Sequence, residues 1–240
     1  MAPRSNVIVR KSVNLSKESH IIASNVDQAV LVATFAYPRT STGFIDRFLV
    51  TAEAYHIPTI IVFNKNDIYD DEQLRQVETL CEVYEKIGYE AFTVSAKTGF
   101  NTERLKDLLR DKLSLLSGHS GVGKSALVNR LDPALDLKEG AISEVHEKGM
   151  HTTTFSQMFP LAFGGYIIDT PGIKEFGLYD LDKSTLAQRF PEMRALMSSC
   201  KFSNCTHLHE PQCAVKKAVA DGLIQQWRYT NYVNMINDDE

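Results

Sequence analysis

The sequence has no apolar run near the roughly 18 residues that a membrane-spanning helix needs, and its N-terminus lacks the apolar stretch of a signal peptide. It also lacks an excess of positive charge, since 26 Lys and Arg stand against 30 Asp and Glu, for a net charge of -4. Proteins that bind nucleic acid by bulk electrostatics are usually strongly basic. We therefore expect a cytoplasmic protein without membrane contact, in which any contact with RNA is local or depends on shape.

Cysteine is scarce too, with four in 240 residues. Cys81 stands alone in a helical pattern and is predicted to be a buried apolar residue. Cys200, Cys205 and Cys213 fall within 14 residues and alternate with histidines. Because disulfides are rare in the cytosol, this second group predicts a metal site.

Short apolar runs alternate with helical patterns along most of the chain, and 43% hydrophobic residues are ample for a core. Continuous apolar runs are typical of strands covered on both faces, and their alternation with helices predicts an α/β fold with a mainly parallel sheet. After Gly177 the strand signals stop, and the remainder predicts helices around the cysteine–histidine group. The predicted strands are Ala29–Thr34, Thr59–Phe63, Ala91–Val94 and Tyr166–Ile168, and the predicted helices are Phe44–Ala52, Asp70–Ile87 and Thr102–Arg110.

A phosphate-binding loop follows the apolar run Leu113–Leu116, because the segment from Gly118 to Ser125 fits the pattern G-x-x-x-x-G-K-[ST]. Its glycines let backbone N–H groups turn toward a phosphate, and the helix that begins near Lys124 adds its positive end. Lys124 is predicted to reach the β- and γ-phosphates and Ser125 to bind Mg²⁺. The ring of His119 is expected to point away from the phosphates, since backbone groups dominate such a loop. A chance glycine turn is the alternative, which the preceding strand disfavours.

Two further motifs indicate that the base is guanine. Asn64-Lys65-Asn66-Asp67 ends one predicted strand and Ser95-Ala96-Lys97 ends the next, where ligand sites of α/β proteins lie. The Asp67 carboxylate can accept from the ring N–H and the exocyclic amine of guanine, whereas adenine offers neither donor there and would leave the carboxylate unpaired. The predicted GTP contacts are Asn64, Lys65, Asp67, Ser95, Ala96, Lys97, Gly118, His119, Ser120, Gly121, Val122, Gly123, Lys124, Ser125, Ala126 and Gly172.

A second set of polar residues surrounds the strand Tyr166–Ile168. Asp169, which begins Asp169-Thr170-Pro171-Gly172, is predicted to hold Mg²⁺ through water, and the Gly172 N–H to sense the γ-phosphate. The polar segment 148–154 is interpreted as a switch loop, with a mere surface loop as the alternative. One of its threonines is expected to close over Mg²⁺. The spacing does not decide among the three, and we favour Thr153.

These motifs run in the order N-K-x-D, S-A-K, phosphate loop, threonine switch and D-T-P-G, whereas ordinary GTPases run from the phosphate loop to S-A-K. The order is a circular permutation. Followed by a cysteine–histidine group, it resembles the ribosome small-subunit-dependent GTPase family (RsgA, also called YjeQ) over nearly all of the chain. The matching segments are Asn25–Gln28, Gly118–Ser125, His151–Thr154, Asp169–Gly172 and Cys200–Val215.

The resemblance implies a late-stage assembly factor for the small ribosomal subunit, with a Mg²⁺-dependent GTPase activity that this subunit stimulates. Its partners would be GTP and GDP, the small subunit and its rRNA. Family members carry an RNA-binding OB-fold barrel ahead of the GTPase domain, so residues 1–13 are expected to be a remnant of that barrel. Residues 14–177 would then form the GTPase domain and residues 178–240 a helical zinc-binding domain. We expect a monomer.

The usual catalytic glutamine after the D-x-x-G glycine is missing, and Ile173 stands in its place. An apolar side chain cannot orient the attacking water, which phosphoryl transfer needs together with Mg²⁺ and charge stabilisation. His151 in the predicted switch is the nearest polar substitute, and contact of this histidine with RNA or solvent is the alternative. The predicted catalytic residues are therefore Lys124, His151 and Thr153.

Three thiolates and one imidazole make a closed tetrahedral ligand set, which is typical of structural zinc. Spacing leaves both His207 and His209 open as the fourth ligand of Cys200, Cys205 and Cys213, and the family's zinc motif favours His207.

Other basic residues of this tail, Lys216, Lys217 and Arg228, could form a local patch that faces RNA, with a solvated helix face as the alternative. A GTP-gated RNA-binding module with negligible hydrolysis is the alternative function. A GTPase that acts on another cellular partner is a third hypothesis.

Overall fold

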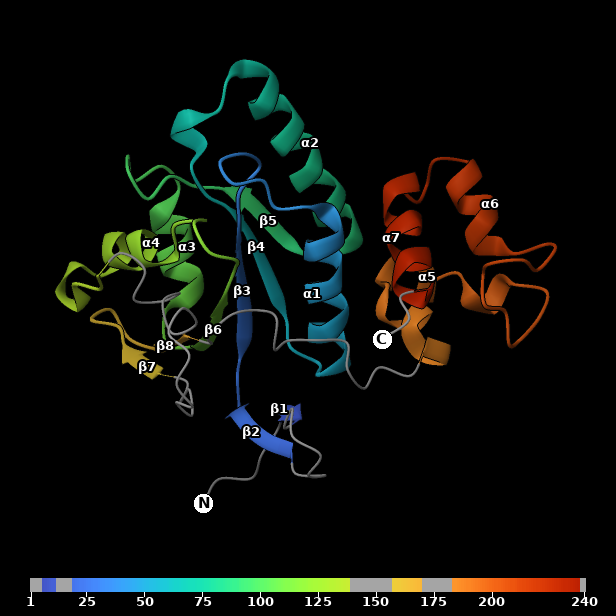
Figure 1. Cartoon of the computed structure of the whole chain (residues 1–240), viewed down its shortest axis with the longest axis horizontal. Coiled ribbons are helices and arrows are strands. Elements are labelled where there is room, and N and C mark those ends of the chain that lie inside the picture. The colour runs from blue at the N-terminus through green and yellow to red at the C-terminus, as the bar shows by residue number, and fades with distance from the viewer. Residues whose placement is uncertain (1–5, 12–18, 139–156, 170–182, 238–240) are drawn as a thin grey trace, which may run out of the picture. The chain divides into compact units, whose positions relative to one another are not determined.

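A computed structural model describes residues 6–11, 19–138, 157–169 and 183–237 of the chain (Figure 1). The chain divides into two compact units. One comprises Met1–Thr40 and Tyr55–Gly177, and the other Ser41–Ala54 and Leu178–Glu240. Among the described residues, no helix is long and apolar enough to cross a membrane.

The first unit is built on a six-stranded sheet in the order β5-β4-β3-β6-β8-β7, parallel except for the edge pair β7–β8. Every residue of β3 and β4 is buried, as the continuous apolar runs predict. The mainly parallel α/β sheet is therefore confirmed. The strands are β3 (Gln28–Ala33), β4 (Thr59–Phe63), β5 (Glu90–Thr93), β6 (Leu113–Ser117), β7 (Gln157–Pro160) and β8 (Tyr166–Asp169).

Two helices of this unit, α3 (Thr102–Leu109) and α4 (Lys124–Leu131), lie next to each other and share one apolar core with the sheet (Figure 1). This core contains Val30, Val62, Leu105, Leu127 and Ile167. A third helix, α2 (Asp71–Ile87), packs against β5. It begins at a capping box, in which Asp70 and Gln73 satisfy each other's backbone N–H groups, and ends at Gly88, whose φ of 112° suits glycine.

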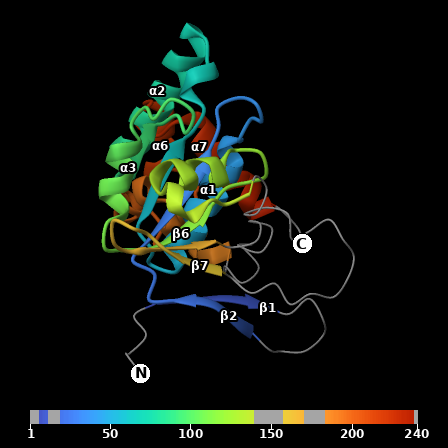
Figure 2. The same ribbon diagram turned by 90° about the vertical axis from the view of Figure 1, so that its left-hand side faces the viewer.

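A separate antiparallel ribbon is formed by β1 (Val7–Lys11) and β2 (Ser19–Ser24), which lie apart from the large sheet in both ribbon views (Figures 1 and 2). Asn6 connects the ribbon to the start of β3. Its amide donates to the Val26 carbonyl at 2.7 Å and accepts from the Val26 N–H at 2.9 Å.

The second unit is helical, and α1 (Thr42–Ala54) belongs to it although its residues precede β4 in the chain. Within this unit α1 packs against α7 (Gln226–Asn237) and the 3₁₀ helix η5 (Lys183–Arg189). The remaining elements are α5 (Pro191–Arg194), the 3₁₀ helix η6 (Met197–Ser199) and α6 (Ala214–Ala220). Their shared core contains Val50, Phe190, Met193, Val215, Tyr232 and Met235.

Arg228 lies inside the second unit and is 1% exposed. Its guanidinium bonds to Asp46 Oδ1 at 2.5 Å and to both oxygens of Glu192, at 2.7 and 3.0 Å. The prediction that Arg228 belongs to a patch facing RNA is therefore wrong. The sequence shows the helix but not that α1 and α5 would cover this side of it.

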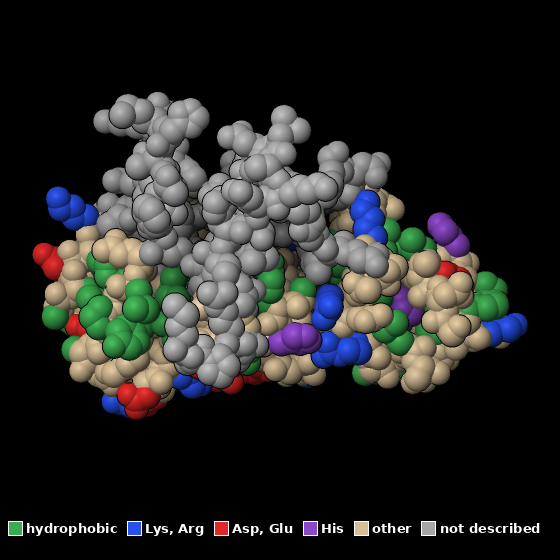
Figure 3. All heavy atoms as spheres, turned by 90° about the horizontal axis from the view of Figure 1, so that it is seen from below, with side chains coloured by type: hydrophobic (Ala, Val, Ile, Leu, Met, Phe, Trp, Pro, Cys, Tyr) green, Lys and Arg blue, Asp and Glu red, His purple; other side chains and the backbone are tan. Residues whose placement is uncertain are grey.

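The two lysines of the same predicted patch also have protein partners. Lys216 Nζ donates to the Leu208 and Glu210 carbonyls, and Lys217 pairs with Asp221. On the face shown in Figure 3, described charged side chains of both signs lie singly or in small groups, as the net charge of -4 leads one to expect.

Candidate nucleotide site and metal centre

The phosphate loop connects the end of β6 to the start of α4, and steric constraints explain why it contains glycines. Gly118, Gly121 and Gly123 have φ values of 148°, 81° and 90°, a region that side chains disfavour. A Cβ on Gly118 would lie 2.2 Å from the Val32 carbonyl oxygen, and one on Gly123 would lie 2.6 Å from Asn64 Nδ2. Only glycine therefore allows the loop to lie this close to its neighbours.

Lys124 and Ser125 are at the N-terminus of α4 and are buried, at 6% and 7% exposed. The Lys124 ammonium donates to two carbonyls of the loop, Gly118 O at 2.5 Å and His119 O at 3.2 Å. It therefore lies inside the curve of the loop that the sequence assigns to phosphate. The His119 ring contacts the Thr40 hydroxyl at 2.7 Å and the Ser120 carbonyl at 3.0 Å.

Asn64 joins the three predicted nucleotide loops to one another. Its side chain is 2% exposed, donates to the Val122 carbonyl at 2.9 Å and accepts from the Ala96 N–H at 3.1 Å. The N-K-x-D loop, the phosphate loop and the S-A-K loop thus meet at one buried amide. The N–H of Ala96, one of the predicted GTP contacts, lies at this junction.

The Asp67 carboxylate is oriented by the S-A-K loop. Ser95 Oγ donates to Asp67 Oδ1 at 2.5 Å, and Lys97 Nζ lies 3.9 Å from Asp67 Oδ2 on a largely exposed side chain. One donor therefore fixes one carboxylate oxygen, while the other lies beside a mobile cation. This is a suitable acceptor for two adjacent N–H groups of a base.

The predicted Mg²⁺ and switch residues are described only in part. Asp169 ends β8 and pairs in register with Leu116, so its backbone lies beside the end of β6 that leads into the phosphate loop. His151, Thr153, Gly172 and Ile173 lie outside the described residues.

The structure also shows site residues that the sequence did not single out. Tyr69 OH donates to the Asn64 carbonyl at 2.5 Å and accepts from the Phe35 N–H at 2.9 Å, and thereby holds the N-K-x-D loop. Thr40 contacts the phosphate loop. Neither residue belongs to a motif, and the sequence signal for Thr40 was the position of residues 35–40 directly after a buried strand.

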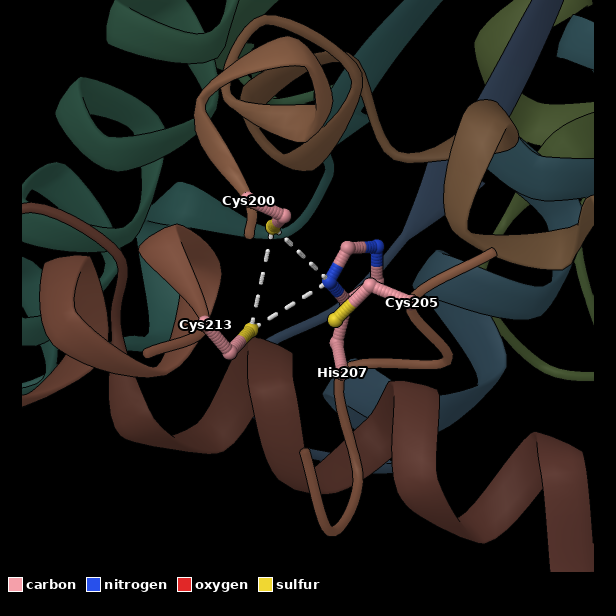
Figure 4. Close-up of side chains that lie close together, drawn as sticks. All are labelled: Cys200, Cys205, His207 and Cys213. Carbon is pink, nitrogen blue, oxygen red and sulfur yellow. Dashed lines mark hydrogen bonds between the residues drawn. The ribbon is translucent and has the colours of Figure 1, made fainter. Parts of the chain in front are cut away.

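In the second unit, Cys200, Cys205, His207 and Cys213 place their ligand atoms within 4.8 Å of one another (Figure 4). The separations are 4.0 Å between Cys200 Sγ and Cys213 Sγ, and 3.7 and 3.3 Å from His207 Nδ1 to these two sulfurs. A tetrahedral zinc with bonds of about 2.0–2.3 Å would place its ligand atoms about 3.5–3.8 Å apart. The cluster therefore fits one metal ion, with Nδ1 as the histidine ligand atom.

The protonation of the cluster follows from its burial. Burial lowers the pKa of His207 and keeps the ring neutral, which is the form that binds metal. Burial, together with the neighbouring thiols, raises the pKa of Cys205 to about 12. The Cys205 thiol is therefore protonated unless a cation is present, and a bound metal ion would displace its proton.

Glu210 shapes the loop that presents His207. Its carboxylate accepts from Thr206 N and Oγ1, both at 2.7 Å, and from the N–H groups of Leu208 and His209. Burial opposes ionisation, but these hydrogen bonds outweigh it and lower the pKa of Glu210 to about 2. The His209 side chain is exposed and is not a member of the cluster.

A glycine loop that feeds a helix, beside a carboxylate loop at the carboxyl ends of a parallel sheet, defines a P-loop GTPase. Here the guanine motifs precede the phosphate loop, so the class is a circularly permuted one. The chain belongs to the RsgA GTPase family, whose model matches residues 1–179, and the resemblance drawn from the motifs is confirmed.

Relatives with this description cover almost the whole chain. It is 52% identical over 237 residues to the small ribosomal subunit biogenesis GTPase RsgA of Bacteroides fragilis, with 99% of this chain and 76% of that one covered. The protein of the same name from Porphyromonas gingivalis is 53% identical over 240 residues, with the same coverage.

Two solved structures share the fold. YjeQ from Thermotoga maritima has a TM-score of 0.78 at 39% identity, with 98% of this chain and 75% of that chain covered. YloQ, described as a circularly permuted GTPase, has a TM-score of 0.74 at 32% identity, with 99% and 81% covered.

Proposed function

We propose that this protein binds GTP, hydrolyses it with Mg²⁺, and acts in late assembly of the small ribosomal subunit, which stimulates the hydrolysis. The observation that carries the chemistry is the single junction at Asn64, which joins the base-binding and phosphate-binding loops. The choice of subunit rests on the names of the relatives, which are small ribosomal subunit biogenesis GTPases.

Base selection falls to Asp67. Its carboxylate, fixed by Ser95, accepts from the guanine ring N–H and amine, and the stems of Lys65 and Lys97 cover the two ring faces. An adenine base would offer this carboxylate no donor, so the proposed site discriminates against adenine nucleotides.

Phosphate binding falls to the loop N–H groups, the Lys124 ammonium and the positive end of α4. A bound Mg²⁺ would neutralise negative charge on the phosphates. Ser125 is a proposed direct ligand, with Asp169 acting through water and Thr153 closing from the switch. The oxygens of Ser125 and Asp169 are the hard ligands that Mg²⁺ prefers.

Hydrolysis needs a group that orients water, and Ile173 cannot supply one. We assign this role to His151 and expect slow turnover without a partner, below roughly 10⁻² per second, as in GTPases without a working glutamine. The small subunit would then accelerate the reaction by ordering the switch around the γ-phosphate.

The cysteine–histidine cluster is proposed to hold one structural zinc. Four protein ligands leave no position for water, so the ion would stabilise the small second unit and take no part in hydrolysis. The first unit would therefore carry the chemistry, and the second would contribute to recognition of the partner.

Single-turnover GTP hydrolysis, titrated with purified small subunits and in parallel with large subunits, tests this function. We expect acceleration by small subunits only, and salt should shift it to higher subunit concentrations, because contacts with RNA phosphates weaken with salt. Equal rates with either subunit would exclude the ribosome assignment. Undetectable hydrolysis in every case would favour a GTP-gated RNA-binding module.

A further inference from the structure

The segment between β3 and α1, residues 35–40, lies against the phosphate loop. Thr40 is 6% exposed, and its Oγ1 lies 2.7 Å from His119 Nε2. Pro38 faces the same loop, since a Cβ on Gly121 would lie 3.4 Å from Pro38 Cδ. The side of the phosphate loop that carries the His119 ring is therefore covered by this segment.

The hydrogen bonds of the His119 ring have a definite direction. The Ser120 carbonyl can only accept, so His119 Nδ1 carries a proton and donates to it at 3.0 Å. Thr40 Oγ1 already accepts from the Thr34 N–H at 3.0 Å, and in the Nδ1–H tautomer of His119 its hydroxyl donates to Nε2 at 2.7 Å. The partners thus assign one tautomer and a continuous chain from Thr34 to the loop.

This chain of hydrogen bonds begins at a rigid point, because Thr34 directly follows β3 and is completely buried. The loop also touches β3 at Gly118, whose absent Cβ would collide with the Val32 carbonyl. Two consecutive residues therefore attach the phosphate loop to β3, Gly118 through its backbone and His119 through its side chain.

The same segment is also bonded to the guanine side of the site. Lys65 Nζ donates to the Tyr37 carbonyl at 2.5 Å, and the Phe35 N–H donates to Tyr69 OH, which in turn donates to the Asn64 carbonyl. Residues 35–40 thus connect the loop proposed to bind the base with the loop proposed to bind the phosphates.

We propose that His119 is a positioning residue: through Thr40 it holds the phosphate loop in the geometry that receives the nucleotide, without touching GTP itself. The inference rests on the proposed GTP site. N–H groups that are fixed beforehand bind charge without reorganisation. Without this bond the loop would lose one of the contacts that fix it before nucleotide binds, so affinity would fall and dissociation would accelerate.

Binding of fluorescent GDP and GTP to His119→Ala, Thr40→Val and the double variant tests this role. Both single changes remove the hydrogen bond between Thr40 and His119, and we expect the Kd to rise about three- to tenfold, mostly through faster dissociation. The double variant should be no weaker than the weaker single one, because both changes break the same bond.

Matched controls separate positioning from folding. Thr40→Ser keeps the hydroxyl and should restore wild-type Kd, and His209→Ala removes an exposed histidine and should change nothing. Three outcomes would each overturn the proposal. The first is a wild-type Kd in His119→Ala, and the second is a loss of affinity in the double variant that equals the product of the two single losses. The third is a lowered melting temperature of the nucleotide-free protein that explains the loss. Lys124→Ala tests the site itself: if it binds GTP normally, the proposed GTP site fails independently of His119.

Discussion

Asp67 has one carboxylate oxygen bound by the Ser95 hydroxyl, so a substituted amide would have a preferred orientation. In Asp67→Asn the amide oxygen would accept from Ser95, and the NH₂ group would face the base. Xanthine has a carbonyl where guanine has its amine, and this carbonyl needs a donor. We expect the variant to lose GTP affinity by about 10²-fold or more and to gain xanthosine triphosphate.

Competition of the two nucleotides against a fluorescent guanine nucleotide measures this exchange. Asp71→Asn is a matched control, because Asp71 is an exposed residue in the first turn of α2. Wild-type GTP affinity in Asp67→Asn would mean that N-K-x-D occurs here by coincidence.

At the scale of the element, the loop from Cys200 to Cys213 holds its ligand atoms together, while burial opposes ionisation of the Cys205 thiol. Metal analysis should find one zinc per chain, and Cys205→Ala with Cys213→Ala should abolish it. Chelation should unfold the second unit before it affects GTP binding, since the three cysteines of the cluster pack within the apolar core of that unit.

The side chain of His209 provides the control for this site. His209→Ala should keep the full zinc content, because His207 supplies Nδ1 to the cluster. Zinc retained after loss of both cysteines, or lost in His209→Ala, would contradict the ligand set.

The sequence predicts those elements whose signal is local. The buried strands β3 and β4 are continuous apolar runs, and the phosphate loop needs its glycines because backbone atoms approach them closely. The edge strand β7 could not be found, because most of its side chains are exposed and it contains a proline. The positions of Thr40 and Arg228 could not be found either, since their partners are distant in the chain.

At the scale of the whole molecule, Arg228 and Asp46 form an ion pair that excludes solvent, with side chains 1% and 0% exposed. Removing one partner leaves the other charge buried without its counter-ion, which typically costs about 3–5 kcal/mol. Arg228→Ala should therefore lower the free energy of unfolding of the second unit by about this amount, as measured by thermal or urea denaturation.

Arg194→Ala is the comparison, because Arg194 pairs with Glu53 at 2.9 Å while half of its side chain is exposed. Screened surface pairs contribute about 0–1 kcal/mol, so the effect should be small. Similar losses of unfolding free energy in Arg228→Ala and Arg194→Ala would show that the buried pair contributes no more to stability than the surface pair.

The position of α1 has a consequence for how the protein can be made and altered. Ile45, Phe48 and Asp46 are fully buried, yet α1 leaves the ribosome well before η5, α5 and α7, its partners within the unit, have been synthesised. The second unit can close only by a long-range contact, which is the slow kind of folding step. No single cut in the chain releases it intact, so it cannot be lost, exchanged or fused elsewhere as one continuous cassette.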